Sequence, residues 1–324
     1  MADENGGLIV IGENINTTRR IKATSKNVVK EDGKVGWAYT DLDGTRRMLD
    51  ITDIYPDDPA KVQTERIGHI GQGVRKQDLD FLRWAILSQV EAGSTIVDLC
   101  VDELSVYPEE RHEYMKWIVK TAQQISDVSF AIDSSDPETI RHGLEVYDRS
   151  KGRPAINSVS LEPGRDVLIQ LGKDEDCYIF ANGSGDSGMP QDAQERVDNL
   201  TGCMDLMDKV GVPMEDRFLD PLVFPVGAGP DFGKHYLDSV KILREKYPDV
   251  HIFGGLSNVS FGLPRRKLLN HAFITLSIVA GCDAIMIDPL MNPSHEYKEF
   301  VIAARVMTAE DEYALNYLKY IRSQ

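Results

Sequence analysis

The feature that most constrains the fold is a regular alternation of short apolar runs and longer helical patterns, which begins near Lys76 and continues to the C-terminus. The short runs are rich in β-branched and aromatic residues, and the longer patterns repeat their apolar positions with the period of a helix. The units recur at spacings of roughly 25 to 45 residues. Strands that alternate with helices form right-handed βαβ units, and therefore a parallel sheet.

Eight strands are expected, which is the number that closes a (β/α)8 TIM barrel. The predicted strands are residues 8–12, 94–99, 129–132, 155–159, 177–181, 218–219 with its neighbours, 250–253 and 284–287. The predicted helices are residues 77–92, 109–126, 137–147, 164–172, 192–210, 232–246, 267–280, 295–307 and 310–321. The sequence thus predicts an α/β protein with a single barrel domain over residues 1–324.

An insertion from about residue 17 to 75 follows the first strand and lacks this regularity. It contains the turn dipeptides Asp32-Gly33, Asp43-Gly44 and Asp58-Pro59, and we expect a hairpin around residues 37–48. An insertion at this point of a barrel lies over the carboxyl ends of the strands as a lid or a partner surface. An inert excursion fits the sequence equally well.

Composition excludes several classes of protein. The formal net charge of -16 argues against nonspecific nucleic-acid binding, and we read the acidic surplus as a dispersed, solubilising surface. No apolar run approaches the ~18 residues of a membrane span, and no cationic segment leads into an apolar one near the start, so a cytoplasmic location is the default expectation. The four cysteines are scattered, which favours reduced thiols in or near the core over disulfides or a structural zinc site.

Every predicted strand ends at or near a carboxylate or an amide. These residues are Glu13 or Asn14, Asp98, Asp133, Asn157, Asn182, Asp220, Asn258 and Asp288. In a closed barrel the carboxyl ends of the strands converge on one mouth, where active sites of this fold lie. Single members of the set have structural alternatives, because Asp133 or Asp136 can cap a helix, while Asp220 and Asp288 each precede a proline in a turn. Chance supplies one or two such residues more easily than eight.

The loop from Gly254 to Ser260 shows the pattern best. Two glycines follow a short strand and allow close approach of a ligand, and the loop then displays Ser257, Asn258 and Ser260 before a long helix. The predicted mouth is poor in cations, which argues against a phosphate-bearing ligand. Carboxylates and amides suit a neutral heterocycle with a donor–acceptor edge, such as an aminopyrimidinone.

A divalent metal is the competing interpretation, because clustered carboxylates also bind Mg²⁺. The frequency of Asn in the set makes a metal less attractive, and no histidine pair has ligand spacing, so we expect no metal site. Four histidines are expected on helices as surface or packing residues: His112, His142, His235 and His271.

Six segments resemble the pterin-binding TIM-barrel methyltransferases. They are Ile9–Asn16, Ile96–Leu99, Ala131–Ser135, Ala155–Ser158, Asp220–Leu222 and Gly255–Ser260. That family includes methyltetrahydrofolate:corrinoid/iron–sulfur protein methyltransferase, the folate domain of cobalamin-dependent methionine synthase and, more distantly, dihydropteroate synthase. The similarity extends over most of the chain in order. It does not cover residues 17–75. Cys100 stands where the methyltetrahydrofolate:corrinoid/iron–sulfur protein methyltransferase, a more compact enzyme, resembles Asp-Leu-Asn.

The resemblance implies roles for matching residues. Asp133 and Asp220 would hold the amino-pyrimidine edge of the pterin, and Asn157 would contact the same ring system. Asn258 would hydrogen-bond near N5, the atom that carries or receives the methyl group. The predicted catalytic residues are Asn258 and Asp220, and the predicted pterin-binding residues are Glu13, Asp98, Asp133, Asn157, Asn182, Asp220, Ser257, Asn258 and Arg266.

The resemblance also implies a reaction. The substrates would be tetrahydrofolate or 5-methyltetrahydrofolate and a corrinoid (cobalamin) carried by a separate partner protein. We favour methyl transfer from the corrinoid protein to tetrahydrofolate, as in the second methyltransferase of an O-demethylase system. The runner-up is methyl transfer from methyltetrahydrofolate to a corrinoid/iron–sulfur protein. A non-catalytic pterin-binding or corrinoid-escort barrel is the alternative of another class, and a homodimer is suggested by the family.

Overall fold

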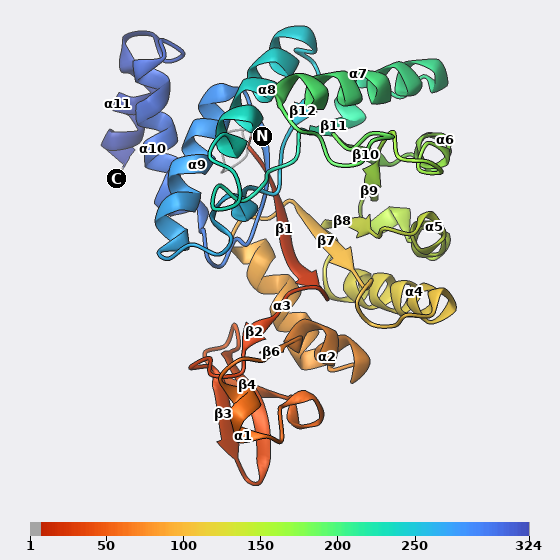
Figure 1. Ribbon diagram of the computed structural model, residues 1–324. Coiled ribbons are helices and arrows are strands. Elements are labelled where there is room, and N and C mark those ends of the chain that lie inside the picture. The colour runs from red at the N-terminus through yellow and green to blue at the C-terminus, as the bar shows by residue number, and fades with distance from the viewer. Residues whose placement is uncertain (1–7, 324) are drawn as a thin grey trace. The chain divides into compact units, whose positions relative to one another are not determined.

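The structure, a computed structural model, describes residues 8–323. Eight parallel strands belong to one sheet and alternate with helices, which confirms the predicted (β/α)8 barrel (Figure 1). The chain divides into two compact units, which we describe in turn. Of the described residues, unit 1 contains 8–12, 92–95 and 155–323, and unit 2 contains 13–91 and 96–154.

Unit 1 holds most of the barrel strands. Four of them are neighbours in the order of the chain: β9 (Ala155–Val159), β10 (Tyr178–Asn182), β11 (Arg217–Asp220) and β12 (His251–Ile252). β13 (Ala284–Ile287) pairs in parallel with the first half of β1 (Ile9–Asn16). The helices of this unit are α6 (Val167–Asp174), α7 (Ala193–Val210), α8 (Phe232–Lys246), α9 (Arg266–Ala280), α10 (Ser294–Met307) and α11 (Leu315–Ser323).

The core of unit 1 is apolar and aromatic. Phe180, Phe218 and Phe253 are almost fully buried, and the ring of Phe180 lies 4.9 Å from each of the other two. Helix ends follow local chemistry as well, because the Asp192 side chain accepts a hydrogen bond from the Glu195 N–H at the start of α7, and Gly211 ends that helix in a left-handed conformation.

An ion cluster at Asp283 joins the ends of the barrel sheet within unit 1. β12 contributes only two residues to its ladder, and Asp283 directly precedes β13. Its carboxylate accepts hydrogen bonds from the Ile252 N–H (2.9 Å) and from Arg244 (2.8 Å), and it lies 2.8 Å from Nδ1 of His251. Burial raises the pKa of Asp283, but these partners outweigh it and hold that pKa below its usual value.

Unit 2 contains the second half of β1, the strands β7 (Ile96–Cys100) and β8 (Ser129–Asp133), and the helices α2 (His69–Arg75), α3 (Leu79–Glu91), α4 (Pro108–Ile125) and α5 (Pro137–Glu145). Asp136, rather than Asp133, caps α5, since its carboxylate accepts the N–H of Glu138 at 3.1 Å. Pro137 occupies the first turn of that helix, where a missing N–H costs nothing.

The insertion folds into two small antiparallel sheets and a short helix. The predicted hairpin is confirmed by β4 (Lys34–Thr40) and β5 (Arg46–Asp50), which β3 (Val28–Glu31) extends to three strands (Figure 1). β2 (Ile21–Lys22) pairs with β6 (Arg66–Ile67), and α1 spans Pro59–Val62. Helix α2 lies within the range that the sequence assigned to irregular structure, because its glycines obscure the helical pattern.

An aromatic cluster packs the insertion against α3. Trp37 lies 4.8 Å from His69, 5.3 Å from Trp84 and 5.8 Å from Phe81, measured between ring centroids, and Tyr39 lies 4.8 Å from Trp84. Burial, together with the charge of Arg19, lowers the pKa of His69 to about 4, so this imidazole is neutral near pH 7. The insertion is therefore anchored by apolar packing.

Several predicted boundaries are wrong; the helix predicted at residues 164–172, for example, is α6 (Val167–Asp174). β1 continues to Asn16 rather than ending at Gly12, so Glu13 and Asn14 lie within the strand. β12 is shorter than predicted, because neither Val250 nor Phe253 joins its ladder. α11 begins at Leu315 rather than residue 310, since the preceding connection contains several residues with positive φ.

The cysteines behave as predicted, because all four are buried and free. Over residues 8–323, no helix combines the length and apolar character required to cross a membrane.

Replacing Trp37 by Ala tests the anchoring of the insertion. We expect Trp37→Ala to lower the free energy of unfolding by roughly 3–5 kcal/mol, because it removes a buried indole and leaves a cavity among four rings. Thr40→Ala, at an exposed position of the same strand, should change it by less than about 0.5 kcal/mol. Equal values for the two variants in urea denaturation would show that the cluster does not anchor the segment.

Candidate functional site

Three predicted site residues of unit 1 lie on neighbouring strands. Asn182 and Asp220 are the last residues of β10 and β11 and are direct partners in the ladder. Asn157 differs from the prediction, because it is the middle residue of β9 rather than its end, and it pairs with Phe180. The register between β9 and β10 shifts immediately after this pair, and the Asn157–Ser158 peptide bond is cis. All three residues are half-buried.

The side-chain amide of Asn182 forms hydrogen bonds within the protein. Its Nδ2 donates to Oγ of Ser158 at 2.7 Å, and its Oδ1 accepts the N–H of Ser184 at 3.0 Å. These bonds join the end of β9 to the loop that follows β10. Asn182 therefore orients neighbouring chain, and one amide hydrogen is left over for a ligand.

Asp220 occupies a low-dielectric position. Burial raises its pKa to about 7, although the N–H of Leu222, which donates to Oδ1 at 2.7 Å, and the charge of Arg196 act in the opposite direction. The bond to Leu222 fulfils the turn that the Asp-Pro dipeptide predicted. A carboxyl group with a pKa near 7 can give or take a proton at neutral pH.

Arg196 is a site residue that the sequence analysis missed. It is fully buried near the start of α7, and its Nη1 donates to the carbonyl oxygen of Asp192 at 2.7 Å. The guanidinium lies 4.7 Å from the ring of Phe224, and its Nη2 has no hydrogen-bond partner among residues 8–323. An Arg in the first turns of a polar helix resembles a surface residue in sequence, so only the fold places its charge near Asp220.

The loop after β12 holds Asn258 open to solvent. Residues Leu256–Ser260 form a 3-10 turn, and the Asn258 side chain is exposed and forms no hydrogen bond with any residue of the described chain. Arg266, predicted as a pterin contact, braces this turn: it donates to the carbonyl oxygen of Ser257 at 2.7 Å and to Oγ of Ser260 at 3.0 Å. A braced loop thus presents a free amide.

Gly254 is required by packing. A Cβ at this position would lie 2.7 Å from the hydroxyl oxygen of Tyr236, whose hydroxyl donates to the Phe253 carbonyl oxygen at 3.0 Å. That the two glycines also let a ligand approach stays a prediction. Asp288 also has a structural role, because its carboxylate accepts the N–H groups of Leu290 and Met291, both at 3.1 Å.

Carboxylates gather at the strand ends of unit 2. Asp98 is buried within β7, and Asp133 is the last residue of β8, where it pairs with Cys100. Burial raises the pKa of Cys100, and the nearby charges of Asp133, Asp102 and Asp98 raise it further, which places these carboxylates around the thiol. The thiol is accordingly protonated and unreactive near neutral pH.

Asp102 is a second residue that the sequence analysis missed. Its carboxylate accepts hydrogen bonds from Oγ of Ser134 (2.6 Å), from the N–H of Ser135 (2.8 Å) and from Oγ of Ser135 (2.7 Å). It therefore fixes the segment immediately after Asp133. Its position two residues beyond a strand end was the only available signal.

Glu13 lies within β1, and its carboxylate is 3.8 Å from Arg19. The neighbouring Asn14 is buried, and its backbone N–H donates to the Gln89 side chain at 2.9 Å. The predicted polar end of the first strand is thus partly structural.

Three of the histidines contact carboxylates of neighbouring residues. His112 lies 3.0 Å from Asp136, and His142 lies 3.0 Å from Glu145. The stretch Asp249–Gly254 has the Asp-x-His-x-x-Gly spacing of a cobalt-ligand motif. Its His251, however, contacts Asp283 and lies 4.4 Å from the ring of Phe218, so it helps to hold the barrel strands.

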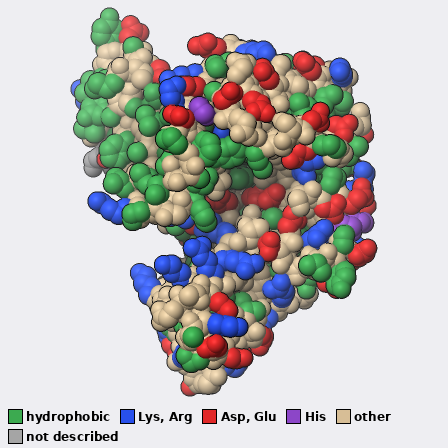
Figure 2. All heavy atoms as spheres, in the orientation of Figure 1, with side chains coloured by type: hydrophobic (Ala, Val, Ile, Leu, Met, Phe, Trp, Pro, Cys, Tyr) green, Lys and Arg blue, Asp and Glu red, His purple; other side chains and the backbone are tan. Residues whose placement is uncertain are grey.

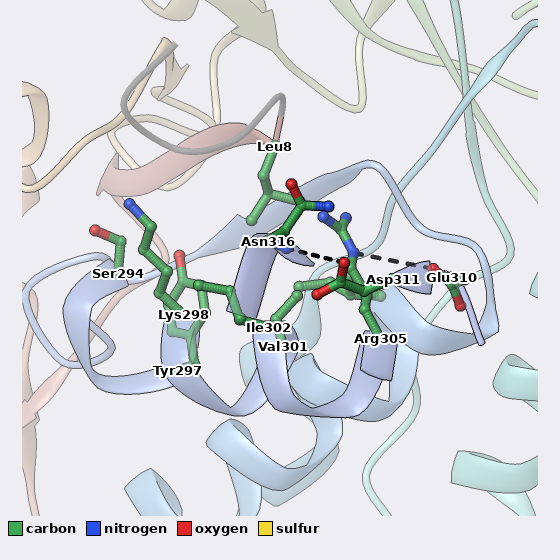
Figure 3. Close-up of a pocket in the computed structure, with 11 residues that line it drawn as sticks. Leu8, Ser294, Tyr297, Lys298, Val301, Ile302, Arg305, Glu310, Asp311 and Asn316 are labelled. Carbon is green, nitrogen blue, oxygen red and sulfur yellow. Dashed lines mark hydrogen bonds and ion pairs between the residues drawn. The ribbon is translucent and has the colours of Figure 1, made fainter. Parts of the chain in front are cut away.

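A cavity of about 470 Å³ lies elsewhere in unit 1, among α10, the connection to α11 and the start of β1 (Figure 3). Leu8 and Val301 line it, and Asp311 accepts the backbone N–H of Asn316 beside it at 3.0 Å. Leu8 precedes the amino end of β1, whereas the candidate residues occupy carboxyl ends of strands. The cavity is therefore separate from the candidate site.

Comparisons with known proteins identify the family of this chain. The family model described as "Pterin binding enzyme" matches residues 70–288. The chain is 30% identical over 256 residues to the methylcorrinoid:tetrahydrofolate methyltransferase of Eubacterium limosum, which covers 78% of this chain and 91% of the relative.

Solved structures show the same fold. Dihydropteroate synthase of Yersinia pestis with a pterine–sulfa conjugate has a TM-score of 0.55 and 17% identity, and covers 69% of this chain and 90% of that one. The enzyme of Stenotrophomonas maltophilia with bound imidazole has a TM-score of 0.54 and 16% identity, with 70% and 89% covered. At this identity the likeness concerns the fold alone.

The raised pKa of Asp220 predicts a pH dependence of stability. Its folded-state pKa of about 7 exceeds the unfolded value of 3.8, so the folded state binds the proton more tightly, and stability falls as pH rises from about 4 through 7. Asp220→Asn removes this contribution. Between pH 5 and 8 the variant should lose less free energy of unfolding than the wild type, by on the order of 2 kcal/mol. Parallel pH slopes in urea denaturation would contradict the assignment.

Proposed function

Because the chain belongs to the family of pterin-binding enzymes, we propose that it is a methyltransferase that moves a methyl group from a corrinoid protein to N5 of tetrahydrofolate. The named activity of the Eubacterium limosum relative supports this reaction, since the two chains match over most of their lengths. The corrinoid belongs to a separate partner protein, and it supplies the methyl group.

The observation that carries the proposal is the open amide of Asn258. Its side chain is exposed on a loop braced by Arg266 and has no hydrogen-bond partner among residues 8–323. An amide offers both a donor and an acceptor, which suits a ring nitrogen that changes its protonation during the reaction. Asn258 has no useful pKa, so its role is to orient and stabilise the pterin at N5.

Asp220 is the proposed proton acceptor. When N5 of tetrahydrofolate forms its bond to the methyl group, the bond between cobalt and that methyl group breaks, its electron pair stays with the metal, and N5 must lose its proton. A carboxyl group with a pKa of about 7 can take that proton near neutral pH, directly or through a water. In the reverse direction the same group protonates N5, which makes the nitrogen a better leaving group.

The remaining pterin contacts are proposed from the family resemblance. Asp133 would hold the amino-pyrimidine edge through two parallel hydrogen bonds, and Asn157 would contact the same ring. Ser257, Arg266 and Asn182 act chiefly through the loops that they hold. Asp98 and Glu13 complete the proposed set.

Methyl transfer from methyltetrahydrofolate to a corrinoid/iron–sulfur protein is the second candidate, because the proposed residues serve either direction. A non-catalytic pterin-binding barrel is the candidate of another class. We further propose an O-demethylase system and a homodimer, which the family resemblance suggests, and a cytoplasmic location, which is the default expectation from the sequence. An assay with tetrahydrofolate and a methylated corrinoid tests catalysis: pterin binding without demethylation of the corrinoid would contradict it.

The amide of Asn258 should govern turnover. Asn258→Ala should lower kcat by roughly 10² or more, with a smaller change in KM for tetrahydrofolate, because the lost hydrogen bond matters most during transfer. Gln63→Ala removes an exposed amide from the insertion and should leave kcat unchanged. If Asn258→Ala has wild-type kinetics, this residue is not part of the site.

The carboxylate of Asp133 should govern binding. Asp133→Ala should weaken tetrahydrofolate binding by roughly 10- to 100-fold, the effect of losing a charged hydrogen-bond partner. Glu138→Ala, at an exposed helical position close in sequence, should bind normally. Titration calorimetry measures both, and an unchanged Kd for Asp133→Ala would remove Asp133 from the pterin site.

A further inference from the structure

Charge is distributed unevenly between the insertion and the rest of the chain. Residues 17–75 contain 11 Lys and Arg against 9 Asp and Glu, a net charge of +2. The remaining residues contain 25 against 43, a net charge of -18. The composition suggested that the acidic surplus is dispersed over the whole chain. It is not, because the insertion has a small positive net charge.

Like charges face each other on the small β2–β6 sheet. Lys22 and Arg66 are direct partners in this antiparallel pair, so their side chains project from the same face. Both are exposed, as is Lys26, which follows the turn after β2. Like charges directly opposite each other destabilise a strand pair. We call Lys22, Lys26 and Arg66 the basic ribbon, and Figure 2 shows Lys and Arg side chains gathered over this part of the insertion.

The basic ribbon has no counter-charge within unit 2. None of its three side chains forms a hydrogen bond or ion pair with another residue in the described range 8–323. Neighbouring carboxylates are engaged elsewhere: Glu65 lies 3.9 Å from Lys61, and Glu103 lies 3.1 Å from Arg20. Three exposed cations without partners, two of them mutually repulsive, can be neutralised by an anionic surface from outside.

The basic ribbon also lies close to a strand end of the barrel. Lys22 follows Asn16, the last residue of β1, by six positions, so their Cα atoms are at most about 22 Å apart. A protein–protein interface of ordinary size covers about 800 Å² on each partner, a disc of roughly 16 Å radius. The disc is roughly 32 Å across, which exceeds the largest possible distance between Asn16 and Lys22. A protein that presents a methyl group to the carboxyl end of β1 can therefore also contact the basic ribbon.

Resting on the proposed function, we propose that the basic ribbon docks an acidic face of the protein that carries the corrinoid. Most of this chain is strongly acidic, so an acidic partner is repelled except at the insertion. Exposed charges at an interface rim mainly steer the encounter, and salt screens them. The basic ribbon would thereby select the productive orientation of the partner.

The test uses the double variant Lys22→Glu/Lys26→Glu. It leaves Arg66 in place opposite a carboxylate, so the β2–β6 pair gains an attraction and folding is not weakened. The matched control is Lys209→Glu/Lys241→Glu, which makes the same charge change at exposed positions of α7 and α8 in unit 1. Neither control lysine forms an ion pair with a described residue.

The substrates are tetrahydrofolate with either of two methyl donors: free methylcobalamin, or a purified methylated corrinoid protein. At low ionic strength the double variant should lose about tenfold or more in kcat/KM for the corrinoid protein, and the loss should vanish at high salt. With free methylcobalamin the double variant should match the wild type. The control variant should match the wild type with both donors.

Other outcomes overturn the proposal. An equal loss in the control assigns the effect to net charge, and an equal loss with free methylcobalamin assigns it to chemistry or folding. A rise in KM confined to polyglutamyl tetrahydrofolate, with the monoglutamyl form unchanged, assigns the basic ribbon to the folate tail. If the wild type transfers methyl from neither donor, the proposed function itself fails. If the wild type is active and the double variant equals the control, only the docking proposal fails.

Discussion

The carboxylate of Asp283 is the contact on which the barrel sheet of unit 1 most depends. β12 is only two residues long, too short to secure its place by ladder hydrogen bonds alone. Asp283 binds the backbone of Ile252, the side chain of His251 and the guanidinium of Arg244, and so joins β12, α8 and the start of β13. The loop that carries Asn258 follows β12, so the contacts of Asp283 with β12 also help to position that loop.

Polar residues near the strand ends divide into two groups. Asn182 and Arg266 in unit 1, and Asp102 in unit 2, form several hydrogen bonds each and fix loops of their own unit. The side chain of Asn258 is exposed and forms no hydrogen bond within the described chain, and Asp220 is held where burial raises its pKa to about 7. In the proposed reaction another protein supplies the methyl carrier, so positioning is the main task of these residues, and a rigid frame with a few available groups suits that task.

The insertion gives this barrel a feature that the shared fold does not explain. Aromatic packing of Trp37 and Tyr39 anchors it to α3, while its outer edge carries the cations of the basic ribbon. Apolar anchoring leaves those charges free for an external partner. The buried rings therefore stabilise the insertion, and the exposed cations provide long-range electrostatic attraction.

The sequence by itself determined the order and type of the barrel elements, since hydrophobic period and strand-end chemistry are local signals; α8 and β13 match their predicted ranges at both ends. It also supplied the family resemblance and thereby Asn258, Asp133 and Asp220. Only the tertiary structure decided which polar residues are braces, because hydrogen-bond partners such as Asp102 for Ser135 are set by packing across tens of residues. Likewise, the burial of Arg196 near Asp220 follows from helix packing on the sheet, which no spacing in the sequence encodes.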